Sequence, residues 1–282
     1  MSDVRAWWEA GRRERIVLGE QERSIFVRRM GGGPSITLLH GFPSSSHDWA
    51  KIAPALSDSH ALLLPDLLGF GASDKPEDHR YSIYEQADLV QQVWALEGVE
   101  RTRVIAHDYS VTVTQELLAR QAEGRLAVEL EAVWLLNGGL YPDLHRPEPV
   151  QVALADPEQG PKLSAALTEE LWAQALRPTF APGFDARVDS ADLWIAATEG
   201  GVVLHRLIAY MEERRENAGR WVGALEQTDV PLSFVWGMLD PISGAHVAER
   251  VRERLPRAPL LALNHVGHWP QLEAPERVLS AL

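Results

Sequence analysis

Two possible nucleophiles stand two positions apart in the stretch VIAHDYSVTV, residues 104–113. A carboxylate such as that of Asp108 is ionised at neutral pH and attacks a saturated carbon that bears a leaving group. A hydroxyl such as that of Ser110 needs a neighbouring base and attacks acyl carbon instead. Which of the two residues attacks therefore decides the chemistry of the protein.

The spacing of small residues favours Asp108. A nucleophile elbow turns sharply from a strand into a helix, strains its central residue and needs small residues two positions before and after it. Centred on Asp108, the elbow has Ala106 and Ser110 at these positions, and both are small. Centred on Ser110, it has Asp108 and Thr112, which fit less well. We therefore predict Asp108 as the nucleophile; the alternative is that Asp108 only caps the helix that follows.

A His-Gly turn follows the apolar run ITLL in the stretch LHGFPSSSHDW, residues 39–49. Backbone N–H groups in such a turn can stabilise a developing oxyanion. We expect the N–H groups of Phe42 and Tyr109 to be two donors to one oxyanion. His40 and His107, which flank this region, are predicted to orient the backbone rather than to carry protons.

A second carboxylate and a histidine follow near the C-terminus. WGMLDPISG places Asp240 just past an apolar run, and LNHVGHWPQLEAPE places His268 just past the next one. Reactive groups collect at the carboxyl ends of the strands in an open parallel sheet, so both residues can meet Asp108 there. The order Asp108, Asp240, His268 is the chain order of α/β-hydrolase triads. His265, at the start of its loop, is predicted to be structural.

The elements that must position these residues alternate along the chain. Short apolar runs lie at residues 35–40, 60–66, 101–108, 130–137, 230–237 and 258–264. Helical patterns lie between them at 82–97, 110–121 and 244–254. This alternation predicts an α/β fold with a mostly parallel, doubly wound sheet, to which RIVLG and SIFVRR add an antiparallel edge hairpin.

The strand rhythm stops between residues 139 and 219, where Pro and Gly punctuate several helical patterns. We predict a helical cap over residues 139–219. The cap is inserted into a hydrolase core made of residues 1–138 and 220–282.

Composition narrows the classes of function. A net charge of −13 and a pI near 5.2 disfavour nucleic acid and acidic membrane surfaces as partners. The chain has no cysteine, and its histidines lack metal-ligand spacing, so we expect neither a disulfide framework nor a metal or other cofactor. No signal peptide or long apolar run is visible, so we expect a soluble, cytoplasmic protein that can form a homo-oligomer.

Taken together, these stretches resemble the α/β-hydrolase branch with an aspartate nucleophile, which contains the haloalkane dehalogenases and epoxide hydrolases. Within that branch, the chain is similar to the mesoderm-specific transcript homologue family. The resemblance is carried by LLHGFPSSSHDW, PDLLGFGASDKPEDHRYSIYEQADLV, AHDYSVTVTQELLAR, LNGGLYPDLHRP, RRENAGRWVGAL, GMLDPIS and HVGHWPQLEAPE, with a weaker match in WWEAGRRERI. These stretches span nearly the whole chain.

The resemblance implies an α/β-hydrolase sheet with a helical cap. It also implies Asp108 as nucleophile, Asp240 as acid and His268 as base. Two departures stand out: relatives have Gly at the position of Ser110, and the membrane-embedded start of some relatives is not seen here.

The leaving group depends on what assists its departure. An epoxide oxygen needs an acid, which relatives supply as tyrosine hydroxyls from the cap; Tyr210 is the first candidate here and Tyr141 the second. A halide needs N–H donors such as indoles, and dehalogenase relatives place one directly after the nucleophile, where this chain has Tyr109. Trp269 is predicted to line the pocket, whereas Trp172 is predicted to pack within the cap.

We therefore predict a hydrolase that forms an alkyl ester on Asp108, acting on an apolar small molecule that is first of all an epoxide. The alternatives are a haloalkane dehalogenase with the same nucleophile, an esterase that uses Ser110, and a binding protein without turnover.

Overall fold

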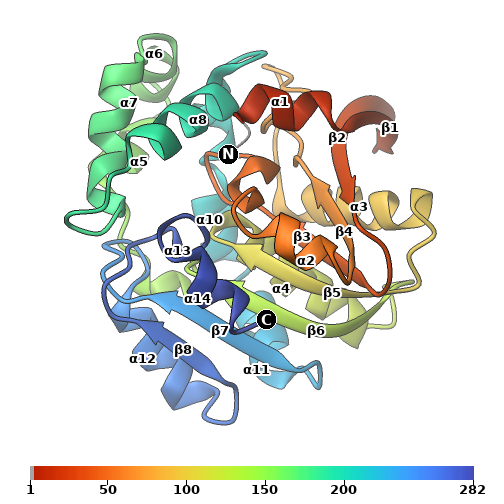
Figure 1. The fold of residues 1–282 in the computed structure, drawn as a ribbon. Coiled ribbons are helices and arrows are strands. Elements are labelled where there is room, and N and C mark those ends of the chain that lie inside the picture. The colour runs from red at the N-terminus through yellow and green to blue at the C-terminus, as the bar shows by residue number, and fades with distance from the viewer. Residues whose placement is uncertain (1–2) are drawn as a thin grey trace.

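The computed structural model describes residues 3–282, with one eight-stranded sheet at the centre (Figure 1). The strands are β1 (Arg12–Leu18), β2 (Gln21–Met30), β3 (Ser35–Leu39), β4 (Ala61–Pro65), β5 (Arg101–His107), β6 (Glu129–Leu136), β7 (Leu232–Gly237) and β8 (Leu260–Leu263). Their order across the sheet is β1-β2-β4-β3-β5-β6-β7-β8.

Most of the sheet is parallel, as predicted. β3 to β8 pair in parallel with their neighbours, whereas β1 and β2 form an antiparallel hairpin that joins the sheet through β4. The predicted α/β fold and its edge hairpin are confirmed. Because parallel strands end at the same edge, the segments that follow β3, β5, β6, β7 and β8 come together at one side of the sheet.

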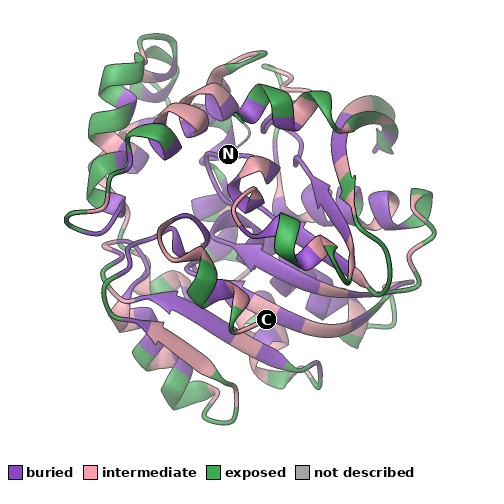
Figure 2. Ribbon diagram, in the orientation of Figure 1, coloured by how far each residue is buried: buried purple, intermediate pink, exposed green. Residues whose placement is uncertain are grey.

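Helices cover both faces of the sheet. Successive strand residues alternate between two buried apolar clusters: Leu38 and Leu64 belong to one, Leu39 and Leu63 to the other. The first cluster is covered by α1 (Val4–Glu9), η1 (Ser46–Trp49), α2 (Ala53–Ser57) and α14 (Pro275–Leu279). The second is covered by α3 (Ile83–Leu96), α4 (Tyr109–Ala122), α11 (Ala218–Gln227) and α12 (Ala245–Arg254). The short helix α13 (Pro270–Glu273) contributes Leu272 to the second cluster. Strands β3, β4, β5 and β7 are accordingly buried over most of their length, whereas β1, β2 and β8 are more exposed (Figure 2).

A run of helices separates β6 from β7. It begins with η2 (Pro142–Leu144) and continues with α5 (Pro149–Ala155), α6 (Gln159–Ala165), α7 (Glu169–Leu176), η3 (Arg177–Thr179), α8 (Arg187–Thr198), α9 (Leu204–Leu207) and α10 (Tyr210–Glu216). We call α5 to α10 the inserted helices. In Figure 1 they lie on the side toward which the arrowheads of the central strands point. The domain boundaries at residues 139 and 219 stay a prediction.

No helix within residues 3–282 has the length and apolar character needed to cross a membrane.

Candidate active site

Asp108 stands alone between a strand and a helix. β5 ends at His107 and α4 begins at Tyr109, so Asp108 makes the whole turn. Its backbone has φ 47° and ψ −106°, and among residues 3–282 it is the one non-glycine residue with positive φ. Such a conformation costs about 1–3 kcal/mol and persists only where the surroundings impose it. The side chain is 7% exposed, so the strained turn presents a nearly buried carboxylate.

Ser110 lies below the elbow rather than beside the reactive carboxylate. It is fully buried in the first turn of α4, and its hydroxyl donates a hydrogen bond to the carbonyl oxygen of His40. His40 in turn accepts a hydrogen bond at Nε2 from the backbone N–H of Leu67, at 3.0 Å. The serine that replaces the glycine of relatives is therefore accommodated by a backbone acceptor.

The turn after β3 brings a backbone donor to the elbow. The N–H of Phe42 donates to Oδ2 of Asp108 at 3.0 Å. The close approach requires Gly41, because a Cβ there would lie 2.7 Å from Nδ1 of His107 and 2.9 Å from Cβ of Asp108. Tyr109 is the first residue of α4, so its N–H has no partner inside the helix. The two expected oxyanion donors thus flank Asp108.

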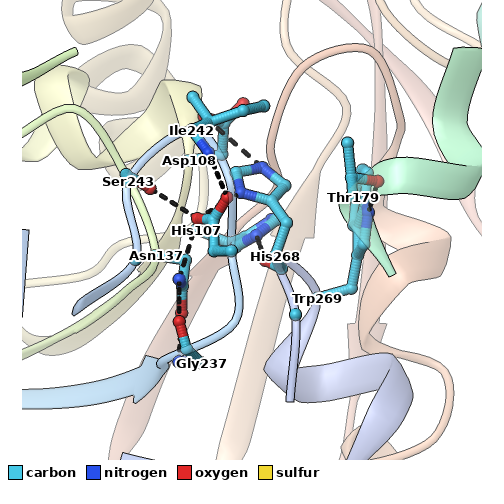
Figure 3. Close-up of polar contacts among 12 residues, drawn as sticks. His107, Asp108, Asn137, Thr179, Gly237, Ile242, Ser243, His268 and Trp269 are labelled. Atoms are coloured by element: carbon cyan, nitrogen blue, oxygen red, sulfur yellow. Dashed lines mark hydrogen bonds and ion pairs between the residues drawn. The ribbon is translucent and has the colours of Figure 1, made fainter. Parts of the chain in front are cut away.

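The second carboxylate and the histidine meet the elbow from β7 and β8. Nδ1 of His268 lies 2.8 Å from Oδ2 of Asp240, and Nε2 of His268 lies 3.7 Å from Oδ1 of Asp108 (Figure 3). His268 and Asp240 are 2% and 4% exposed. The structure therefore brings the three residues predicted from chain order into one contiguous line.

Asp240 is held by three further donors. Its Oδ2 accepts from Nδ2 of Asn137 at 2.9 Å and from the hydroxyl of Ser243 at 2.7 Å, and its Oδ1 accepts from the N–H of Ile242 at 2.8 Å. Asn137 also bridges to the neighbouring strand, where its Oδ1 accepts from the N–H of Gly237 at 2.6 Å. With donors on both of its oxygens, Asp240 stays a hydrogen-bond acceptor for His268.

Charge shifts the pKa values of this line. Burial opposes ionisation of Asp240, but the His268 cation and the hydrogen bonds hold its pKa well below the usual value. Burial also opposes the charged form of His268, but the carboxylates of Asp240 and Asp108 raise its pKa to about 9. Burial raises the pKa of Asp108, while the His268 cation, the Arg214 cation and the Phe42 N–H oppose that rise. At neutral pH His268 is thus an imidazolium that lies between the ionised Asp240 and Asp108, whose pKa is raised.

His107 supports the His268 loop. Its Nε2 donates to the carbonyl oxygen of His268 at 2.8 Å, and its Nδ1 accepts from Nε2 of Gln271 at 3.1 Å. Burial, with the nearby His268 charge, holds the pKa of His107 well below its usual value, so the ring is neutral and suits one donor and one acceptor role.

The inserted helices contact the same loop. The N–H of His268 donates to the carbonyl oxygen of Thr179 at 2.7 Å, and the indole N–H of Trp269 donates to the Thr179 hydroxyl at 2.9 Å. The carboxylate of Glu273 accepts from the N–H groups of Ala181, Gly267 and Trp269 at 2.8–3.1 Å. These bonds tie the residues after α7 to the backbone that carries His268.

A pocket opens over Asp108 and His268 between the sheet edge and the inserted helices. The core contributes Phe42, Ile242 and Trp269 to its wall. The inserted helices contribute mostly apolar side chains, namely Val150, Leu154, Leu163, Trp172, Leu176 and Leu204. Apart from Asp108 and His268, few polar side chains line the pocket, and one of them is Gln151. Such a wall suits an apolar substrate.

Tyr210, which was expected to face the substrate, is not among the described residues that line the pocket, but it contacts Phe42 and Gln151, which do line it. Its ring is 2% exposed and packs against the rings of Phe42 and Tyr109, with centroids 5.8 and 5.1 Å away. Nε2 of Gln151 donates to the Tyr210 hydroxyl at 3.5 Å, the long end of hydrogen-bond distances. Burial and the Asp108 carboxylate raise the pKa of Tyr210, so the phenol keeps its proton.

A hydrogen bond from the backbone of Glu148 orients the side-chain amide of Gln151. Its Oε1 accepts from the N–H of Glu148 at 2.9 Å, which leaves Nε2 to face Tyr210. The Tyr210 oxygen therefore accepts from Gln151, and its proton remains available for another acceptor.

The remaining candidates are placed differently. The ring of Tyr141 lies 5.5 Å from the guanidinium of Arg250, and this tyrosine is not part of the pocket wall within the described chain. Trp269 lines the pocket, but its indole N–H is already donated to Thr179. Trp172 packs among the inserted helices as predicted, with its ring centroid 6.0 Å from that of Trp194, but it also lines the pocket, and its buried indole N–H has no partner among residues 3–282.

Several residues of the site carry no signal in the sequence. Asn137, Thr179, Gln151 and Glu273 are ordinary polar residues whose roles depend on partners far away in the chain. Within residues 3–282, no group of three or more His, Cys, Asp or Glu side chains is arranged to hold a metal ion.

Known proteins resemble this chain over most of its length. The sequence profile of the Alpha/beta hydrolase family matches residues 38–281. LipZ of Mycobacterium tuberculosis strain H37Rv is 37% identical over 99% of this chain and 96% of its own length. The mesoderm-specific transcript homolog protein of Homo sapiens is 38% identical over 89% of this chain and 78% of its own length, which confirms the resemblance found in the sequence. The fold is similar to that of the epoxide hydrolase VrEH1 from Vigna radiata, with a TM-score of 0.75, 18% identity and 96% coverage of both chains.

Proposed function

Because this chain belongs to the alpha/beta hydrolase family and is an enzyme of that kind, we propose that it hydrolyses epoxides of apolar small molecules through an alkyl ester on Asp108. One observation carries the proposal. Asp108 lines the pocket from a strained elbow, its Oδ2 accepts from the Phe42 N–H, and its Oδ1 lies 3.7 Å from Nε2 of His268.

In the first step Oδ1 of Asp108 attacks one epoxide carbon. The C–O bond of the ring breaks, and its electron pair moves to the ring oxygen, which takes the phenolic proton of Tyr210. The step needs no base, because the carboxylate is already ionised. It suits the resting charges, in which His268 is an imidazolium and cannot deprotonate a serine.

Between the two steps one proton moves from His268 to Tyr210. Esterification removes the negative charge of Asp108, one of the causes that raise the pKa of His268. The imidazolium then gives up its proton more readily, and the tyrosinate of Tyr210 is the base that accepts it. The result is a neutral His268 and a restored phenol.

In the second step neutral His268 accepts a proton from water as the water oxygen attacks the carboxyl carbon of Asp108. The N–H groups of Phe42 and Tyr109 are the donors for the resulting oxyanion. Collapse breaks the ester C–O bond, and the leaving alkoxide takes the proton of the hydroxyl that water added to Asp108. The diol departs and leaves a carboxylate and an imidazolium, which are the resting charges. The cycle therefore closes without a cofactor or any net proton exchange with solvent.

A trapped intermediate tests this function. In a His268→Gln variant the ester should form but not hydrolyse. Incubation with a panel of terminal aryl and alkyl epoxides, styrene oxide included, should raise the mass of the Asp108 peptide by the mass of the substrate. An adduct on Ser110, or full turnover by an Asp108→Ala protein, would overturn the proposal.

A second candidate is halide displacement by the same nucleophile. The unpaired indole N–H of Trp172 in the pocket wall favours it, since indoles stabilise departing halides. Against it, the Trp269 N–H is already donated to Thr179 and the residue after the nucleophile is Tyr109. Halide release from 1-bromobutane and diol formation from styrene oxide, assayed side by side, separate the two functions.

A further inference from the structure

Arg214, in the middle of α10, is a buried cation with unused donors. It is 2% exposed, and its Nε and Nη2 have no hydrogen-bond partner among residues 3–282. Its neighbour Arg215 has a 52% exposed side chain and pairs with Glu212 at 2.9 Å. Burying a guanidinium with unsatisfied N–H groups costs free energy. A role that needs the positive charge would explain why it is buried here.

The fold makes room for this guanidinium at the edge of the sheet. Gly139 follows β6, two residues after Asn137, and a Cβ at position 139 would overlap Nη1 of Arg214. The side chain therefore occupies space that only glycine leaves open. Arg214 thereby reaches the carboxyl edge of the sheet, where its charge acts on Asp108.

The cation packs on the ring of Tyr210. The two residues are four positions apart on α10, so they share a helix face. The guanidinium carbon lies 4.7 Å from the ring centroid. Two other sides of the ring are covered by Phe42 and Tyr109, whose rings contribute no charge. Arg214 opposes the rise in the pKa of Tyr210 that burial and Asp108 produce.

We propose that Arg214 is a positioning residue that stabilises the negative charge on Tyr210 during epoxide opening. The inference rests on the proposed function. When Asp108 bonds to carbon and the ring C–O bond breaks, the phenolic proton passes to the departing oxygen and leaves a tyrosinate. A tyrosinate buried among aromatic rings is strongly disfavoured, and the guanidinium stacked on it supplies the balancing charge.

The assignment also predicts which step depends on Arg214. Ester formation generates the tyrosinate, so it needs the cation. Ester hydrolysis proceeds with a neutral phenol and uses His268 and the backbone donors, so it does not. Removing the cation should therefore slow the first step and leave the second unchanged, a pattern that a purely structural role does not produce.

The test isolates ester formation, the step that should need the cation. In the His268→Gln background, ester formation with styrene oxide is timed by mass spectrometry for Arg214→Met, Arg214→Lys and the matched control Arg215→Met. We expect Arg214→Met to slow ester formation about 100-fold, comparable to the loss of one oxyanion donor. Arg214→Lys should recover part of the rate, because it keeps the positive charge, and Arg215→Met should react at the parent rate.

A spectroscopic measurement checks the cause. Ultraviolet titration, with Tyr210→Phe as the reference that identifies the Tyr210 signal, should show that Arg214→Met raises the pH at which this phenol ionises. Circular dichroism verifies the fold of each variant, and if Arg214→Met does not fold, the Arg214→Lys rate and titration decide the matter.

The outcomes distinguish the two proposals. An ester that forms at the parent rate in Arg214→Met, or in Arg214→Lys where only that variant folds, would overturn the role of Arg214 and leave the proposed function standing. Absence of any ester on Asp108 in the His268→Gln parent would overturn both.

Discussion

At the scale of single residues, the site depends on the mutual influence of two charges. The Asp108 carboxylate lies 3.7 Å from the His268 ring and helps to keep that ring protonated. The same histidine must become a base once the ester exists. The proposed mechanism therefore requires the pKa of His268 to depend on the charge state of Asp108.

Asp108→Asn imitates the loss of charge on esterification. Because the carboxylate favours the imidazolium, its removal should lower the pKa of His268 from about 9, and the neutral ring should then dominate at a lower pH. Titration of the His268 ring by nuclear magnetic resonance measures both proteins. An equal pKa in the two proteins would contradict this account of the proton cycle.

The sequence allowed part of the site to be predicted residue by residue. Asp108, Asp240 and His268 each follow an apolar run, and residues at the ends of parallel strands must meet. Arg214 could not be found this way, because arginine is usually exposed and nothing in RREN distinguishes the buried residue from Arg215 beside it.

At the scale of elements, strand ends are joined by side chains. Asn137 follows β6 and connects it to β7 by bonding both backbone groups of Gly237 and the carboxylate of Asp240. Its function as a clamp depends on the pairing of β6 with β7, which a local sequence pattern does not specify.

Asn137→Leu should remove this clamp. The substitution leaves buried polar groups of Gly237 and Asp240 without a partner, which should destabilise the protein by about 2–4 kcal/mol. Because Asp240 orients His268, hydrolysis of the ester should slow more than its formation. Urea unfolding gives the stability, and rapid-quench kinetics of the Asp108 ester give the two rates; an unchanged ratio of those rates would refute the clamp.

The inserted helices illustrate a second limit of sequence reasoning. Their existence is visible as a break in the strand rhythm. Their contact with the His268 loop is not, because Thr179 and His268 are far apart in the chain and meet through backbone groups. The contact of Trp172 with the pocket was missed for the same reason: an aromatic residue on an amphipathic helix can contact a core, a pocket or both, and only packing decides.

At the scale of the whole molecule, the sheet delivers charged groups to a site whose other wall is apolar. The strand ends supply Asp108, Asp240 and His268, and the inserted helices supply the hydrocarbon lining. In such surroundings charges interact strongly, and a reaction that keeps the net charge of the site constant is favoured. The proposed cycle meets this condition, because its proton transfers stay within the site and it begins and ends with the same two carboxylates and one imidazolium.

The most direct test follows one oxygen atom. With enzyme in excess over styrene oxide in water enriched in oxygen-18, a single turnover should place the heavy oxygen in the carboxylate of Asp108 and leave the diol unlabelled. The label is located by mass spectrometry of the Asp108 peptide and of the product. Heavy oxygen in the first-turnover diol, with none in Asp108, would contradict the ester on which the whole account depends.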